Sequence, residues 1–296
     1  LAETLIGLGE RNEAIVIYGQ AISLDPSRAA WHHRLAELYD LHRDPASALA
    51  HYQRAAALAI EQNLPAQETA NYLAALARAY ARDHDLEVAC NQFEAALALR
   101  GDSPTWWSQC AQINFELKNY ERAFECFSRA CELQPSDIAS YMGAARSALA
   151  LGRETEAEEK AISILRYDPT NYDALIVMAE IFERRNDVSN ALLAYTQAAD
   201  HTANPIPALL AKAKLLRALK RSDEAIATLE RIVDLAPEDD EAAAQLGEAL
   251  AEANQGQDAL EAFQRAIQIA PRKVAHYVRL GRLYRLTGQL DAALGH

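Results

Sequence analysis

The chain has 296 residues, half of them hydrophobic, and its 42 acidic and 29 basic side chains give a formal charge of −13. Such an acidic chain is a poor candidate for sequence-independent binding of nucleic acid, which needs cations to neutralise phosphates. No stretch approaches the ~20 uncharged apolar residues of a membrane-spanning helix, and four scattered cysteines make no disulfide framework. We therefore expect a cytoplasmic protein that binds neither nucleic acid nor membrane.

Alanine is unusually abundant, with 61 residues in the chain. Alanine has the highest helix propensity and is depleted in strands, so this composition predicts an all-α protein of closely packed helices.

A pattern of small, aromatic and proline residues recurs along the sequence. The spacing Ala-x3-aromatic-x2-Ala-x4-Pro begins at Ala14, Ala123 and Ala259, and filling in the interval gives a period of 34 residues. The predicted units of a single solenoid over 1–296 are, in chain order, 1–28 (partial), 29–69, 70–103, 104–137, 138–171, 172–205, 206–239, 240–273 and 274–296 (partial). Position 20 of each unit, counted from its first residue, is always alanine: Ala14, Ala48, Ala89, Ala123, Ala157, Ala191, Ala225, Ala259 and Ala293.

Each unit contains two amphipathic stretches of roughly 14 residues around a short polar turn, which predicts a pair of helices. The unit 29–69 carries seven extra residues, 63–69. We expect its second helix to run on through Gln62, a turn at Asn63 and Leu64, and Pro65 to open the next helix. This insertion is either a tolerated enlargement of an exposed corner or a protrusion that contacts a partner.

The repeat resembles the tetratricopeptide repeat over essentially the entire chain. This resemblance implies an α-α superhelix, a right-handed solenoid of stacked antiparallel helix pairs, in which the first helix of each unit lines a concave groove. The residues that carry the match are Trp107, Leu35, Ala36, Tyr39, Ala123, Phe127 and Pro135.

No known catalytic motif occurs in the chain, and we predict no catalytic residue, no cofactor and no metal site. The four cysteines contain no Cys-x-x-Cys pair, so we interpret them as small hydrophobic residues in packed layers. His33 and Glu37 are four residues apart beside His32, but two ligands without a nearby third do not make a metal site.

By the family resemblance, positions 2, 5, 6, 9, 12 and 13 of each first helix face the groove. The apolar residues at these positions form a patch that consists of Phe115, Met142, Leu149, Ile176, Val177 and Leu210. This patch is either a binding site or, if the register is shifted by one residue, part of the core. The predicted polar contacts to a partner are Arg78, Arg82, Gln109, Gln112, Arg146, Glu180, Lys214 and Arg217, and the predicted apolar anchors are Phe115, Met142, Leu149 and Ile176.

From the unit 138–171 onward, charges alternate down the stack at position 9, which suggests either ion pairs between units or a polar rail that grips a peptide. Arg279, Arg282 and Arg285 lie in the unit after Glu241, Glu248 and Glu252, and they are expected either to neutralise these acids or to meet an acidic partner. Position 9 reads Glu37, Arg78, Gln112, Arg146, Glu180, Lys214, Glu248 and Arg282.

These observations favour a non-catalytic scaffold whose groove binds a peptide segment or a helix of a partner protein. Position 5 holds no lysine, so the clamp with which co-chaperone members of the family capture a C-terminal carboxylate is not expected. The alternative is a regulatory or substrate-recruiting arm of a larger enzyme, such as a peptidase, a glycosyltransferase or a signalling protein. Both chain ends fall inside predicted helices, and neither end has a polar capping helix. A third hypothesis is therefore self-association through these ends.

Overall fold

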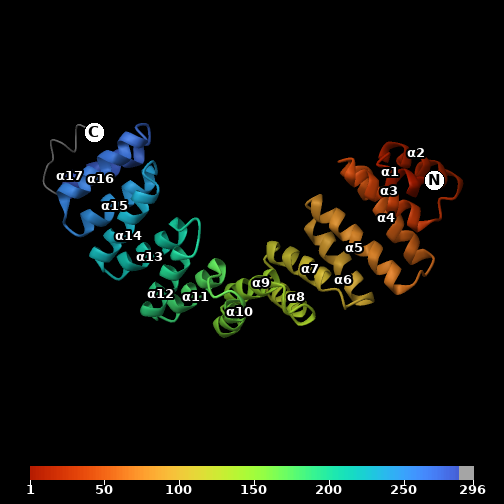
Figure 1. The fold of residues 1–296 in the computed structure, drawn as a ribbon, viewed down its shortest axis with the longest axis horizontal. Coiled ribbons are helices and arrows are strands. Elements are labelled where there is room, and N and C mark those ends of the chain that lie inside the picture. Colours follow the sequence, from red (N-terminus) through yellow and green to blue (C-terminus); the bar gives the residue numbers. More distant parts are fainter. Residues whose placement is uncertain (287–296) are drawn as a thin grey trace. The chain divides into compact units, whose positions relative to one another are not determined.

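A computed structural model describes residues 1–286, and this part of the chain is entirely helical, without any strand (Figure 1). The α-helices are α1 (Ala2–Leu8), α2 (Arg11–Leu24), α3 (Ala29–Leu41), α4 (Pro45–Glu61), α5 (Ala66–Arg82), α6 (Leu86–Leu99), α7 (Pro104–Glu116), α8 (Tyr120–Leu133), α9 (Ile138–Ala150), α10 (Glu154–Tyr167), α11 (Tyr172–Arg184), α12 (Val188–Asp200), α13 (Ile206–Ala218), α14 (Ser222–Leu235), α15 (Asp240–Glu252), α16 (Gly256–Ile269) and α17 (Val274–Leu286).

From 1–28 to 240–273, each predicted unit contains two helices, and successive helices such as α3 and α4, α5 and α6, or α15 and α16 pack side by side. The alanine column explains how they approach so closely, because every member from Ala14 to Ala259 exposes 1% or less of its surface. Ala293 lies outside the described residues. Aromatic side chains such as Phe93 and Phe127 fill the space beside these alanines, so the prediction of an all-α fold in the α-α superhelix class is confirmed.

In each described helix pair, the residue at position 15 of the repeat lies in the turn between the two helices and has a left-handed backbone conformation. Asn186 and Asn254, for example, have φ of 58° and 59°. The amide of the next residue then bonds back to a carbonyl in the last turn of the helix, as Asp187 N does to Phe182 O. The same conformation occurs in the other pairs at Gly9, Arg43, His84, Lys118, Gly152 and Lys220.

The insertion at residues 63–69 lengthens two helices. Helix α4 runs to Glu61 with Gln62 as its C-cap, Asn63 turns the chain with φ of 50°, and Pro65 is the N-cap of α5. The expected turn and the new helix start are therefore confirmed. The extra residues extend the end of α4 and the beginning of α5, so both helices have 17 residues.

The chain divides into two compact units, Leu1–Lys160 and Ala161–His296, which we call the N-unit and the C-unit. The boundary falls within α10, and each unit is described by itself. Among residues 1–286, none of the helices is both long and apolar enough to span a bilayer.

Candidate functional site

The N-unit contains a pocket of about 440 Å³ that is lined by residues of α3, α4, α5, α6 and α7. Four of the predicted contact residues converge there: Arg78 and Arg82 from α5, and Gln109 and Gln112 from α7. They occupy positions 6, 9 and 13 of their units, as the family register predicts. The pocket is lined by Asp40, Tyr52, Ala75, Arg78, Ala81, Arg82, Leu86, Phe93, Gln109, Gln112, Ile113 and Glu116.

Small residues leave room for this pocket. Ala75 and Ala81 of α5 line it where a longer side chain would fill the space, and Phe93 and Ile113 supply apolar wall. The pocket therefore results from the alanine-rich sequence of α5.

Asp40 neutralises one of the two arginines in the pocket. Its carboxylate accepts a hydrogen bond from Arg82 at 2.6 Å and another from the Tyr52 hydroxyl at 2.9 Å. Burial and this carboxylate together raise the pKa of Tyr52, so the phenol stays protonated and remains a donor to Asp40.

Arg78 has a different environment. Within the described part of the chain its guanidinium forms no hydrogen bond and no ion pair, although Asp40 and Glu37 attract it from a distance. Its side chain is exposed on the pocket wall, and partial desolvation by that wall lowers its pKa, the largest of the influences on the group. Arg78 is thus a cation with unused donors that faces the pocket.

Gln109 adds an unused acceptor. Its Oε1 is buried and has no hydrogen-bond partner among the described residues, whereas the amide of Gln112 donates to Glu116 at 3.2 Å. A buried polar atom without a partner costs about 1–3 kcal/mol, so a ligand that donates a hydrogen bond here gains affinity. The pocket accordingly offers one cation and one amide oxygen at neighbouring positions.

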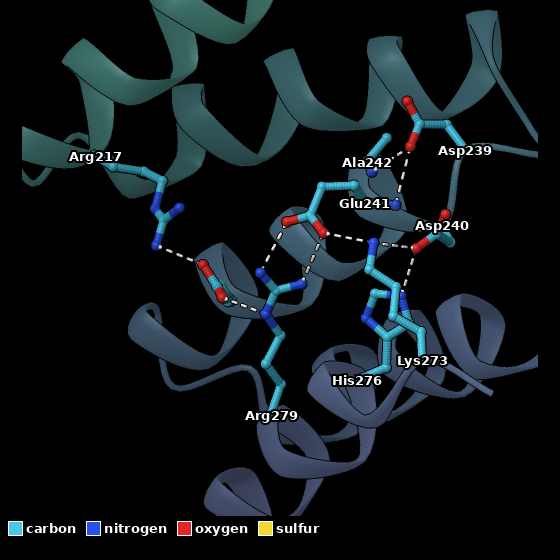
Figure 2. Close-up of polar contacts among 9 residues, drawn as sticks. Arg217, Asp239, Asp240, Glu241, Ala242, Lys273, His276 and Arg279 are labelled. Atoms are coloured by element: carbon cyan, nitrogen blue, oxygen red, sulfur yellow. Dashed lines mark hydrogen bonds and ion pairs between the residues drawn. The ribbon is translucent and has the colours of Figure 1, made fainter. Parts of the chain in front are cut away.

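The C-unit has a pocket of about 400 Å³ built from the same repeat positions, and its two arginines, Arg217 and Arg279, are already paired. Arg217 donates to Glu252 at 2.6 Å. Arg217 and Arg279 also donate to one shared carboxylate, that of Glu248, at 3.3 Å and 2.9 Å (Figure 2). Its lining residues are Leu210, Ala211, Ala213, Lys214, Arg217, Leu229, Glu241, Gln245, Glu248 and Arg279.

This network continues along α15 and α17. Arg279 also donates to Glu241 at 2.8 Å, and Lys273 lies 2.6 Å from Asp240 and 3.1 Å from Glu241 (Figure 2). The buried His276 reaches Asp240 with Nε2 at 2.6 Å. Exposed ion pairs such as that of Lys273 with Asp240 contribute little to stability.

At position 9, Glu248 therefore forms ion pairs with the two adjacent repeats inside the C-unit. The pairs join position 9 to positions 12 and 6 of the adjacent units rather than to position 9. Neutralisation of the acids is confirmed for Arg279, whereas Arg282 and Arg285 form no pair within the part of the chain that the structure describes. Lys214 is exposed and likewise has no ion pair among these residues.

The prediction that Met142 and Leu149 are exposed anchors is wrong. They expose only 9% and 5% of their surface and belong to the core, as does Val177 at 3%. The reason is that α9 is rich in small residues: Gly143 lies so close to Phe127 of α8 that an added Cβ would come within 2.4 Å of the ring. The neighbouring helices cover the longer side chains of α9 as a result.

The remaining predicted residues are dispersed. Phe115 is half-buried and packs edge-to-face on Tyr120, with ring centroids 5.3 Å apart. Arg146 is exposed in the N-unit, whereas in the C-unit Glu180 is exposed and Ile176 is half-buried. The sequence did not predict that Asp40 and Tyr52 also line the N-unit pocket, although Asp40 occupies position 12, one of the expected groove positions.

The histidines near the N-terminus do not assemble a metal site among the described residues. His33 Nε2 lies 3.4 Å from Glu37, and His32 faces His51 with their Nδ1 atoms 3.0 Å apart. Asp240, Glu241 and His276 do converge, but the ammonium of Lys273 already lies against both carboxylates.

The fold and the two pockets define a helical repeat protein whose stacked helix pairs present side chains along one series of helices. The chain belongs to the tetratricopeptide repeat family, whose model matches residues 1–63, 74–138, 142–205 and 210–274. The resemblance that the sequence suggested is thereby confirmed. Proteins of this architecture use extended surfaces for binding, and the family supports a protein-interaction scaffold here.

Relatives of known name cover the chain at low identity. The mouse (Mus musculus) DnaJ homolog subfamily C member 7 is 26% identical over 99% of this chain and 57% of its own length. The human (Homo sapiens) protein O-mannosyl-transferase TMTC3 is 25% identical over 65% of this chain and 19% of its own length. The chain thus spans little more than half of the first of these relatives and a fifth of the second.

A solved structure shows the same fold. A tetratricopeptide repeat protein from Parabacteroides merdae matches with a TM-score of 0.59 and 15% identity, covering 86% of this chain and 98% of that one. At this identity the likeness concerns the fold alone.

Proposed function

We propose that this chain is a non-catalytic scaffold that binds a peptide segment of a partner protein, and that the N-unit pocket anchors an acidic side chain of that segment. The observation that carries the proposal is Arg78, a pocket cation that no carboxylate of the described chain pairs. A carboxylate here would form a charge-assisted hydrogen bond in a partly desolvated place, where such bonds are stronger than in water.

Gln109 supports a peptide rather than a small anion as the occupant. Its unpartnered Oε1 accepts a hydrogen bond, which a backbone N–H of an extended segment supplies and a simple anion does not. The apolar wall of Phe93 and Ile113 suits the adjacent side chain of the peptide. A scaffold of packed helices also loses little conformational entropy on binding.

The test is an array of peptides that differ only at one central position, which is Asp, Asn, Glu or Gln. We expect the wild-type chain to retain the acidic peptides preferentially, and Arg78→Glu to weaken their binding at least tenfold with an unchanged circular dichroism spectrum. The matched control is Arg54→Glu on α4, an exposed arginine outside the pocket, which should change binding less than twofold. Equal binding by wild type and Arg78→Glu would refute this site.

A second candidate function is the recruiting or regulatory arm of a larger enzyme. The relation to a human protein named as an O-mannosyl-transferase supports it, because this chain covers only 19% of that relative. The two functions are separated by the mass of the native protein, measured with an antibody against this chain. A product much larger than 32.6 kDa with transferase activity would favour the enzyme.

A cytoplasmic location and self-association complete the proposal. All four cysteines are free and buried, as in proteins from reducing compartments. Light scattering on the isolated chain measures self-association, and fractionation with the same antibody measures location.

A further inference from the structure

Three cysteines that are far apart in the sequence meet in the interior of the N-unit. Cys90 lies on α6, Cys110 on α7 and Cys126 on α8, and all three are free thiols that expose 9% or less of their surface. The Sγ atoms of Cys90 and Cys110 and a carboxylate oxygen of Glu94 all lie within 4.8 Å of one another. Cys126 is buried in the same hydrophobic core.

Asn114 holds this cluster in place. Its side-chain amide, which exposes only 2%, donates to Cys90 Sγ at 3.2 Å, to the carbonyl of Cys110 at 2.9 Å and to Cys110 Sγ at 3.5 Å. An amide aimed at two sulfur atoms stabilises negative charge on them, as the neighbours of metal-bound thiolates do.

Cys131, elsewhere on α8, is a buried free thiol outside the group formed by Cys90, Glu94 and Cys110, so it is the natural reference thiol.

We propose that Cys90, Cys110 and Glu94 bind a zinc ion. Thiolate and carboxylate ligands are those that Zn²⁺ accepts, at about 2.3 Å for sulfur and about 2.0–2.2 Å for oxygen. Ligand atoms around one such ion lie less than about 4.6 Å apart, so the observed cluster needs only small movements of its side chains. Binding replaces the protons of Cys90 and Cys110, which leave to solvent.

To bind the ion, Glu94 has to give up its present ion pair with Arg122. Its carboxylate now accepts from Arg122 at 2.9 Å, and Arg122 donates to Glu125 at 2.9 Å as well. When Glu94 turns to the ion, Arg122 therefore keeps one carboxylate and the exposed pair loses little. Asp240, Glu241 and His276 offer no such exchange, because Lys273 and Arg279 neutralise the acids of that group.

The test is titration of the reduced, chelator-treated protein with Co²⁺ and then Zn²⁺. Cobalt reports thiolate ligation by an intense sulfur-to-metal charge-transfer band, and Zn²⁺ should abolish this band on displacement. We expect one ion per chain, release of two protons, and a higher melting temperature with Zn²⁺. No charge-transfer band at excess Co²⁺ overturns the proposal.

Three variants make the result specific to the site. Cys90→Ala with Cys110→Ala should abolish the band, Glu94→Gln should weaken Co²⁺ binding about tenfold or more while the band remains, and the control Cys131→Ala should bind one ion as the wild type does. If the double variant fails to fold, Glu94→Gln decides, because the half-exposed residue can change without loss of the core. Undiminished affinity in Glu94→Gln together with loss of the band in Cys131→Ala overturns the assignment.

Discussion

The N-unit and the C-unit differ in how the arginines of their pockets are paired. In the N-unit, Arg78 at position 9 has no ion-pair partner among residues 1–286, and the nearby Gln109 has a free acceptor. In the C-unit pocket, Arg217 and Arg279 share Glu248, and only Lys214 among the lining cations has no ion pair with residues 1–286. We therefore expect a cation of this column to be available to a partner only where the adjacent repeat does not supply the counter-charge.

The largest expected effect concerns stability, through the packing of a glycine against an aromatic ring in each of the two units. A Cβ at residue 143 would come within 2.4 Å of Phe127 in the N-unit, and one at residue 247 within 2.9 Å of Phe263 in the C-unit. Overpacking costs about 1–3 kcal/mol, offset by about 1 kcal/mol of helix propensity gained from Gly to Ala. We expect Gly143→Ala to lower the free energy of unfolding by about 2 kcal/mol and Gly247→Ala by about 1 kcal/mol, measured by urea denaturation. Equal losses would show that the two rings yield alike.

Freeing a cation in the C-unit should imitate the N-unit pocket. Glu248→Gln with Glu252→Gln removes both carboxylates from Arg217, while Arg279 keeps Glu241. We expect the double variant to retain the acidic array peptides about three- to tenfold more strongly than the wild type, measured by fluorescence anisotropy. The control is Glu261→Gln on α16, outside the C-unit pocket, and unchanged binding in the double variant would break the comparison.

Acid should weaken both units through different carboxylates. Hydrogen bonds from His33 and then Arg34 lower the pKa of Glu37 in the N-unit to about 2, and Arg279 lowers the pKa of Glu241 in the C-unit. A lowered carboxylate pKa gives stability that is present above its ordinary value of 4.5 and is lost as pH falls through the folded value. Melting temperatures should therefore fall between about pH 4.5 and pH 2, and less steeply in Glu37→Gln. A wild-type acid profile in that variant contradicts the assignment.

The smallest effect concerns the turns, where the two units should respond alike. Lys118 in the N-unit and Lys220 in the C-unit are left-handed, with φ of 63° and 58°. Glycine adopts this conformation without a Cβ penalty, so each Lys→Gly change should stabilise the chain by about 0.5 kcal/mol. Thermal melts measure the gain. Gly152→Ala, at φ of 73°, is the matched reverse change and should destabilise the chain by about 1 kcal/mol.

The register of the repeat predicted four of the residues that line the N-unit pocket. Arg78, Arg82, Gln109 and Gln112 converge on one pocket because the position of a residue within a helix fixes its face. The same reasoning failed for Met142 and Leu149. Periodicity does not give the distance between helices, which at α9 depends on the contact of Phe127 with a glycine.

The thiol cluster had no signal in the sequence. Cys90, Cys110 and Cys126 occupy positions 21, 7 and 23 of their units and share no motif spacing. They meet because α6, α7 and α8 come from two successive pairs, whose stacking brings these positions together.

The sequence by itself determined the helices, their pairing and the burial of the alanine column, since these follow from local propensity and a period of 34 residues. Only the tertiary structure decided which charges are neutralised and which sulfur atoms meet. Such contacts join side chains roughly one repeat apart, as Arg217 and Glu248 show, and their geometry depends on how one helix pair settles against the next.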